Sequence, residues 1–340
     1  MLRLPVFGFY QPSTIEEATR LLAENPASTR LVAGGTDLWP NMKRRHQVAE
    51  TVISLRGIAE LTGIRETSDG GLAIGATTTL AAIASDLRVG ESYRALATAV
   101  NSISSPLVRN SGTIGGNLCL DTRCTYYNQN EEWRRSIDYC MKEVGEICWV
   151  APSSPRCWAV SSGDSVPILC AWGAEITLVS KDGARTLPLA ELFRDDGIDY
   201  LSKRPDEILT EVRLPAPSGE RAAFWKLRRR GSIDFGVLSV AAVGWCGGET
   251  TDRIEIWLGS VGSTPVRCDE SIAALIGKPI DEDTIAEAAA LARKGEGASP
   301  LGNTDFLPQW RGKMIEHYVA AVLREMAGLP RERLAPRHQR

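Results

Sequence analysis

Cysteines are unevenly spread along this chain of 340 residues, and their distribution restricts its fold more than any other feature. Six of the eight lie in one short stretch, namely Cys119, Cys124, Cys140, Cys148, Cys157 and Cys170. Disulfides are characteristic of small secreted domains. Here the N-terminal segment 1–10 has no signal-peptide cleavage pattern. Clustered cysteines in a cytoplasmic chain are more often ligands or catalysts. We therefore expect a cytoplasmic protein whose function centres on residues 119–170.

The overall composition is that of a soluble globular protein. Hydrophobic residues make up 43% and charged residues 24%, and the formal net charge is -3. This charge provides no strong field to attract nucleic acid, and no apolar stretch is long enough to span a bilayer. We expect neither nucleic acid nor a membrane as a partner, and the length predicts two or three domains.

Short strands alternate with helices, which is typical of an α+β fold. A strand at 7–10 precedes a helix for which Ser13 and Glu16 form a plausible capping box. Turn residues between apolar segments predict two hairpins and a linker at 215–220. The segments expected to flank the two hairpin turns are 62–67 with 72–76 and 174–180 with 185–188. The strands and helices expected after the linker are 222–228, 237–245, 253–259, 269–276, 281–294 and 306–327.

Two glycine-rich loops share one design. Gly34-Gly35-Thr36-Asp37 follows a short apolar strand, and Gly115-Gly116-Asn117 lies in the second loop. Adjacent glycines let successive N–H groups point to one side and form an anion-binding nest. Thr36, Asn117 and Thr113 could add side-chain donors. Each loop alone is more often a tight turn, but the pair favours a pyrophosphate-containing ligand. Neither loop fits the dinucleotide or P-loop consensus.

These segments resemble the medium subunits of the molybdenum hydroxylases, a family that includes xanthine dehydrogenase and carbon monoxide dehydrogenase flavoproteins. The matching segments are 33–38 with 42–43, 111–119, 162–169 and 206–215, and they follow the family order along nearly the whole chain. The resemblance implies an FAD cofactor contacted by Leu31, Val32, Ala33, Gly34, Gly35, Thr36, Asp37, Gly112, Thr113, Gly116, Asn117, Asp164, Leu209 and Lys226. Asp37 could alternatively be a helix N-cap and Asp164 a turn former.

The same resemblance implies the domain organisation. Residues 1–217 would form an FAD-binding domain of two α+β subdomains (PCMH-type), with a cysteine-rich insertion at 121–161. Residues 218–328 would form a smaller C-terminal α+β domain of the CO dehydrogenase flavoprotein type. The basic tail, 329–340, is expected to be disordered.

The insertion at 121–161 carries four cysteines in the pattern Cys124-x15-Cys140-x7-Cys148-x8-Cys157. Such a long excursion is usually functional or disordered, and its aromatic residues argue against disorder. Four thiolates suit a zinc ion or a [4Fe–4S] cluster, and the spacing alone favours neither. The position between two flavin-binding segments favours iron–sulfur. Three cations near these cysteines could offset cluster charge or be solvated surface charges, namely Arg123, Lys142 and Arg156.

The position and spacing of these cysteines are similar to those of the medium subunits of 4-hydroxybenzoyl-CoA reductases. That resemblance implies a [4Fe–4S] cluster on the four cysteines, a large molybdopterin subunit and a small subunit with two [2Fe–2S] clusters, in a dimer of heterotrimers. Ferredoxin would donate electrons, which would pass through this chain to molybdenum for reductive dehydroxylation to benzoyl-CoA. No side chain here would then be catalytic.

Three alternatives remain open at this point. The chain could serve another molybdenum hydroxylase that passes electrons to NAD or another acceptor. The insertion could be a structural zinc module. The chain could also be an FAD-dependent oxidase acting alone, although no acid–base or nucleophile set supports this.

Overall fold

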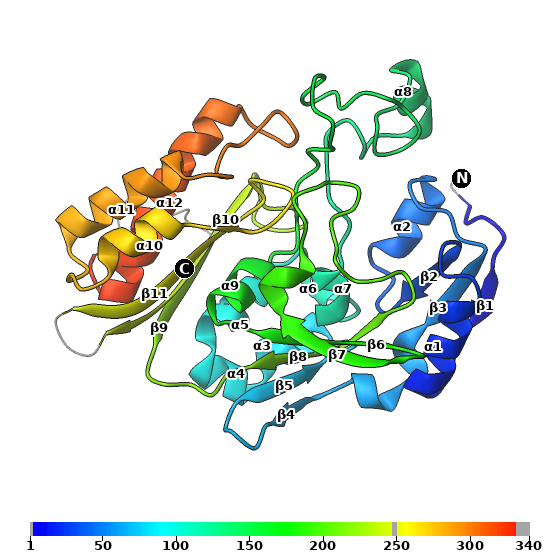
Figure 1. The fold of residues 1–340 in the computed structure, drawn as a ribbon, viewed down its shortest axis with the longest axis horizontal. Coiled ribbons are helices and arrows are strands. Elements are labelled where there is room, and N and C mark those ends of the chain that lie inside the picture. Colours follow the sequence, from blue (N-terminus) through cyan, green and yellow to red (C-terminus); the bar gives the residue numbers. More distant parts are fainter. Residues whose placement is uncertain (1–2, 247–249, 331–340) are drawn as a thin grey trace.

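The computed structural model describes residues 3–246 and 250–330, and within them the strands form three sheets (Figure 1). Each sheet has helices packed against it. The first two sheets belong to the N-terminal part of the chain and the third to the C-terminal part. The α+β fold class expected from the sequence is confirmed.

The first sheet is parallel and has the strand order β1-β3-β2. Its buried side chains, including Ile53, pack against Ala18 and Leu22 of α1. The elements of this part are β1 (Gly8–Tyr10), α1 (Ile15–Glu24), β2 (Thr29–Val32), α2 (Leu38–Lys43) and β3 (Thr51–Ser54), with short 3-10 helices η1 (Leu55–Gly57) and η2 (Ala59–Leu61).

One detail of this part corrects the sequence prediction. The N-cap of α1 is Thr14, whose hydroxyl accepts from the Glu17 amide, and the Glu17 carboxylate accepts from the Ser13 amide. The expected capping box of Ser13 and Glu16 is therefore wrong by one position. The pattern was ambiguous because Ser and Thr are adjacent here, and so are two glutamates.

The second sheet is antiparallel, with strand order β4-β5-β8-β6-β7. Strand β8 returns from far along the chain to lie between β5 and β6, so segments on both sides of the insertion share one sheet. The strands are β4 (Ile64–Glu66), β5 (Leu72–Gly75), β6 (Glu175–Ser180), β7 (Gly183–Pro188) and β8 (Ile208–Leu214). The helices are α3 (Leu80–Ser85), α4 (Leu87–Ser92), α5 (Arg94–Asn101), α6 (Pro106–Arg109), α7 (Ile114–Leu118) and α9 (Val166–Ala171), with η3 (Leu189–Leu192).

The third sheet is antiparallel, with order β12-β11-β10-β9, and α10–α12 cover one face of it (Figure 1). Its strands are β9 (Arg221–Leu227), β10 (Leu238–Cys246), β11 (Thr251–Gly259) and β12 (Val266–Arg267). Its helices are α10 (Asp269–Leu275), α11 (Glu282–Lys294) and α12 (Pro308–Ala327). Asp281 and Thr284 form a capping box at the start of α11.

Both faces of the third sheet are buried. Along β10, Val240 and Ala242 point into the core made with α10–α12, whereas Ala241 and Val243 pack with the core of the second sheet. This alternation arises because successive side chains of a strand point to opposite faces of the sheet. Because α5 and α9 pack against this second face, residues of β9 that share the face of Phe224 point toward the N-terminal part. Lys226 is one of them.

The insertion leaves the second subdomain after α7 and projects beside α2 and the C-terminal part (Figure 1). Its ends close on each other, because the backbones of Arg123 and Val160 exchange two hydrogen bonds of 2.9 and 2.8 Å. Between these two residues, the insertion contains the helix α8 (Glu131–Ser136).

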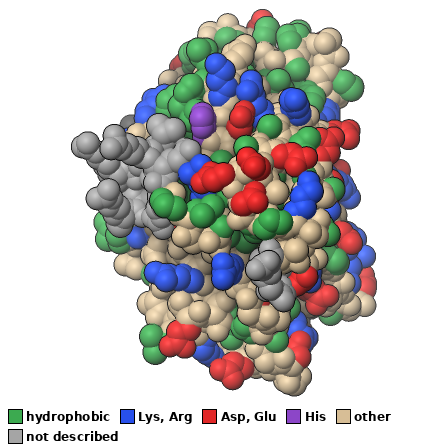
Figure 2. Space-filling model, turned by 90° about the vertical axis from the view of Figure 1, so that its left-hand side faces the viewer, with side chains coloured by type: hydrophobic (Ala, Val, Ile, Leu, Met, Phe, Trp, Pro, Cys, Tyr) green, Lys and Arg blue, Asp and Glu red, His purple; other side chains and the backbone are tan. Residues whose placement is uncertain are grey.

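Figure 2 looks onto the side of α10–α12, where acidic side chains gather near the centre with basic ones around them. No helix within 3–246 and 250–330 is long and apolar enough to cross a membrane. The greater part of the basic tail, residues 331–340, lies outside the described residues.

Candidate functional site

The two glycine loops meet in the folded chain. A Cβ added to Gly34 would lie 2.0 Å from the carbonyl oxygen of Ser111 and 2.9 Å from the Cα of Gly112. A Cβ on Gly112 would in turn lie 3.5 Å from Oγ1 of Thr36. The loops therefore pack backbone against backbone, which requires glycine at position 34. Gly35 has a φ of 71°, in the left-handed region that favours glycine.

The first loop continues from β2, which contains Leu31 and Val32, and leads into α2. Asp37 occupies the N-cap position of α2 but makes no capping hydrogen bond. Its carboxylate instead forms an ion pair with Arg123 at the start of the insertion and accepts from Nδ2 of Asn41 at 2.9 Å. Burial raises the pKa of Asp37, and Arg123 opposes this rise. The alternative of Asp37 as a side-chain helix cap is not what the structure shows.

The second loop begins α7. The Thr113 hydroxyl accepts from the Gly116 amide at 3.2 Å and caps this short helix. Oδ1 of Asn117 accepts from the backbone and the hydroxyl of Ser165, at 3.1 and 2.6 Å. This buried link holds the second loop against the turn that contains Asp164. Strand β8, which carries Leu209, packs against α7.

Asp164 and Lys226 form a fully buried ion pair. Nζ of Lys226 lies 2.7 Å from Oδ2 of Asp164 and also donates to the carbonyls of Ser102 and Asp234, at 3.2 and 3.1 Å. Burial raises the pKa of Asp164, and the cation of Lys226 opposes this effect. The other carboxylate oxygen, Oδ1, is buried and has no hydrogen-bond partner among the described residues.

These features fit a flavin dinucleotide. A buried carboxylate oxygen without a donor is costly, and a ribityl hydroxyl would supply the donor. The first glycine loop could supply N–H groups that suit a pyrophosphate. The second loop does not form the expected nest, because the amides of Gly115 and Gly116 donate to Ala76 and Thr113. The residues that could hold the cofactor are those expected from the sequence, and their individual contacts remain a prediction.

The four insertion cysteines are all buried, with exposed fractions of 8% for Cys124, 7% for Cys140, 4% for Cys148 and 4% for Cys157. Cys124, Cys140 and Cys157 pack in one cluster with the side chains of Tyr127 and Ala159. The insertion therefore has a small core of its own, to which these three side chains contribute.

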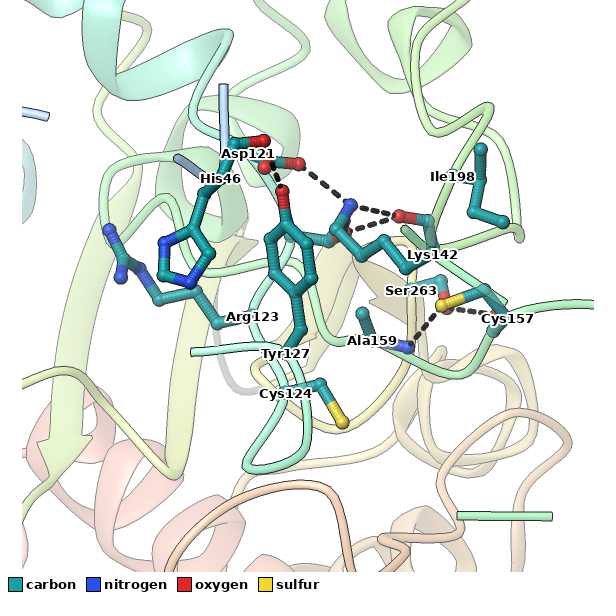
Figure 3. Close-up of polar contacts among 12 residues, drawn as sticks. His46, Asp121, Arg123, Cys124, Tyr127, Lys142, Cys157, Ala159, Ile198 and Ser263 are labelled. Carbon is teal, nitrogen blue, oxygen red and sulfur yellow. Dashed lines mark hydrogen bonds and ion pairs between the residues drawn. The ribbon is translucent and has the colours of Figure 1, made fainter. Parts of the chain in front are cut away.

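A backbone amide donates a hydrogen bond to one of these sulfurs. The Ala159 amide donates to Sγ of Cys157 at 3.4 Å, as Figure 3 shows. Burial raises the pKa of Cys157 to about 11 and that of Cys124 to about 12. The amides of Tyr126 and Tyr127 act in the opposite direction on Cys124. N–H groups directed at sulfur are a feature that tunes protein-bound iron–sulfur centres.

Within 3–246 and 250–330, no three His, Cys, Asp or Glu side chains form a group that could hold a metal ion. Zinc and iron–sulfur clusters both take cysteine thiolates as ligands, and this finding favours neither of them. The four-cysteine ligand set stays a prediction.

Sequence reasoning missed several residues that build this region. Ser165, which binds Asn117, and Gly197, which packs against Cys157, are examples. Asn303 also contacts the insertion, because its carbonyl accepts from Thr125 and its amide donates to the carbonyl of Trp158. No local pattern marked these residues, since each acts across a large sequence separation.

Comparison with known proteins agrees with the fold and the glycine loops. Residues 5–217 match the family described as "FAD binding domain in molybdopterin dehydrogenase", and residues 222–326 match "CO dehydrogenase flavoprotein C-terminal domain". Fold and loops define the class of the protein as an α+β flavoprotein. The chain belongs to the family of FAD-binding subunits of molybdenum hydroxylases.

Several curated relatives match along nearly the whole chain. The carbon monoxide dehydrogenase medium chain of Hydrogenophaga pseudoflava is 28% identical, covering 94% of this chain and 97% of its own length. The 6-hydroxypseudooxynicotine dehydrogenase complex subunit alpha of Paenarthrobacter nicotinovorans is 27% identical over 95% and 96%. The solved carbon monoxide dehydrogenase from Hydrogenophaga pseudoflava superposes with a TM-score of 0.78, at 27% identity, over 96% of this chain and 98% of that one.

Proposed function

We propose that this chain is the electron-transfer flavoprotein subunit of a molybdenum-enzyme complex and that it carries a [4Fe–4S] cluster beside its FAD. FAD would lie where the two glycine loops meet, near the buried pair of Asp164 and Lys226. Cys124, Cys140, Cys148 and Cys157 would hold the cluster. When bound, the two groups supply one-electron and two-electron chemistry. The side chains of this subunit hold the cofactors and set their environment, and none is catalytic.

One observation carries this proposal. The insertion closes at Arg123, which precedes Cys124 and whose guanidinium pairs with Asp37 of the first glycine loop. This ion pair ties the segment that begins with Cys124 to the first glycine loop of the proposed flavin site. A structural module for docking could be placed anywhere on the surface, whereas an electron relay has to be close to the flavin.

The proposed complex contains a large molybdopterin subunit and a small subunit with two [2Fe–2S] clusters. We propose that it removes the phenolic hydroxyl of 4-hydroxybenzoyl-CoA as water, using a pair of protons and a pair of electrons from reduced ferredoxin, to give benzoyl-CoA. This finer assignment is supported by the position and spacing of the four cysteines.

The activities named for the curated relatives are compatible with a second candidate. They include carbon monoxide dehydrogenase, nicotinate dehydrogenase and aldehyde oxidoreductase subunits. In this alternative the chain serves another molybdenum hydroxylase, with electrons leaving to NAD or another acceptor. The insertion would then be an auxiliary relay or a structural zinc module.

Anaerobic stopped-flow reduction of the purified complex distinguishes the two candidates. Rapid bleaching of the flavin absorbance by reduced ferredoxin but not by NADH, together with formation of benzoyl-CoA, is the expected result. Rapid reduction by NADH without turnover of 4-hydroxybenzoyl-CoA would favour the second candidate.

A further inference from the structure

The three cations that lie near the insertion cysteines have different surroundings in the structure. Arg123 is paired with Asp37 of the first glycine loop. Arg156 stacks on Trp158 and pairs with Asp195, a side chain that is 54% exposed. Lys142 differs from both because its side chain is only 6% exposed. A buried ammonium loses its hydration, so its charge acts over a longer range than that of a solvated one.

The ammonium of Lys142 is held by oxygen atoms from three residues. Nζ lies 2.8 Å from Oδ1 of Asp121, 2.8 Å from Oγ1 of Thr122 and 2.6 Å from the carbonyl oxygen of Gly197. Figure 3 shows these bonds converging on Nζ, with the ring of Tyr127 beside the chain of Lys142. The geometry fixes a full positive charge at one point between the insertion and the flavin domain.

This point is adjacent to the cysteines. Gly197, whose carbonyl accepts from Lys142, packs so closely on Cys157 that an added Cβ would lie 2.7 Å from Sγ. Lys142 also follows Cys140 by two residues in the sequence.

Nζ also lies 5.1 Å from the ring centre of Tyr127 and 5.4 Å from that of Tyr200. Tyr127 belongs to the cysteine cluster, whereas Tyr200 lies in the FAD-binding domain outside the insertion. The ammonium therefore lies against a ring of the cysteine cluster and a ring of the FAD-binding domain.

We propose that Lys142 is a positioning residue that raises the reduction potential of the proposed [4Fe–4S] cluster, with Asp121 limiting this effect. The inference rests on the proposed function. A fixed cation favours the reduced form because that form carries one more negative charge. Asp121 offsets part of the cation's field, so the two residues should shift the potential in opposite directions.

The test is a redox titration of the cluster in the purified complex, followed by low-temperature EPR. Replacing Lys142 with methionine should reduce the ratio of reduced to oxidised cluster at a fixed potential about tenfold, a shift of about 59 mV to lower potential for a one-electron couple. The matched control is Arg135→Met, which removes an insertion cation that is 67% exposed and also paired with a carboxylate. It should leave the midpoint unchanged.

Asp121→Asn is the second test variant in this redox titration, because it keeps a polar side chain while removing the negative charge. It should move the potential upward. General damage to the insertion would not shift the two variants in opposite directions. If Lys142→Met fails to retain iron, the inference is tested by the midpoint potential of Asp121→Asn alone. A midpoint that moves downward or stays unchanged in that variant overturns the inference.

The outcomes also separate this inference from the proposed function. Normal iron content with an unchanged midpoint in Lys142→Met overturns the role of Lys142 alone. Absence of iron and sulfide from the unmodified protein overturns both.

Discussion

The backbone contact between the two glycine loops leads to a sharp prediction for Gly34→Ala. The added Cβ would lie 2.0 Å from the Ser111 carbonyl oxygen and 2.6 Å from its carbonyl carbon, whereas ordinary contacts begin near 3.4 Å. The neighbouring atoms are backbone and cannot rotate away. The loops would have to separate by more than 1 Å. Forced overpacking of this kind costs about 1–3 kcal/mol.

If FAD lies across both loops, that energy is lost from binding. A loss of about 1–3 kcal/mol corresponds to about 5- to 150-fold weaker binding. FAD can be titrated into the flavin-free protein by following the quenching of its fluorescence. The matched controls are Gly90→Ala in α4 and Gly312→Ala in α12, because an added Cβ meets nothing within 4 Å at either position. Both should bind FAD normally and be slightly stabilised. FAD affinity for Gly34→Ala equal to that of the controls would refute the reasoning.

Three further predictions concern other parts of the site. Replacing any one of the four insertion cysteines with serine should remove most of the iron and leave FAD largely bound. The control Cys268→Ser should keep the iron. Full iron content in all four variants would contradict the ligand assignment. Lys226→Met should destabilise the flavin-free protein by about 3–5 kcal/mol in urea unfolding because it leaves Asp164 buried and unpaired, and adding Asp164→Leu should recover much of this loss. The pKa of His46 is lowered by burial to about 4, so its contribution to stability is present above about pH 6.5 and is lost as the pH falls toward 4. Urea midpoints should therefore fall less steeply with acidification in His46→Phe than in the unmodified protein; equal slopes would contradict this.

The local elements of the fold were predictable because their signals are local. Hairpins, the C-terminal helices and both glycine loops were visible as turn residues and apolar periodicity. The error at the start of α1 arose because Ser13 and Thr14 are adjacent candidates for one N-cap, and only packing selects Thr14.

The assembly of the site was less predictable from the residues alone. Asp164 and Lys226 are far apart in sequence, and their pairing depends on the third sheet turning one face of β9 toward the flavin domain. Burial of Lys142 depends on Gly197, which has no local pattern that links it to the insertion. The cysteine spacing indicated a metal centre, but it could not show that Arg123 would tie that segment to Asp37.

The central claim is that this chain holds an FAD and an iron–sulfur cluster side by side. The most direct test is the content of FAD, iron and acid-labile sulfide in protein purified without oxygen. We predict about one FAD and about four iron atoms per chain, with matching sulfide. About one zinc per chain with neither iron nor sulfide would contradict the claim.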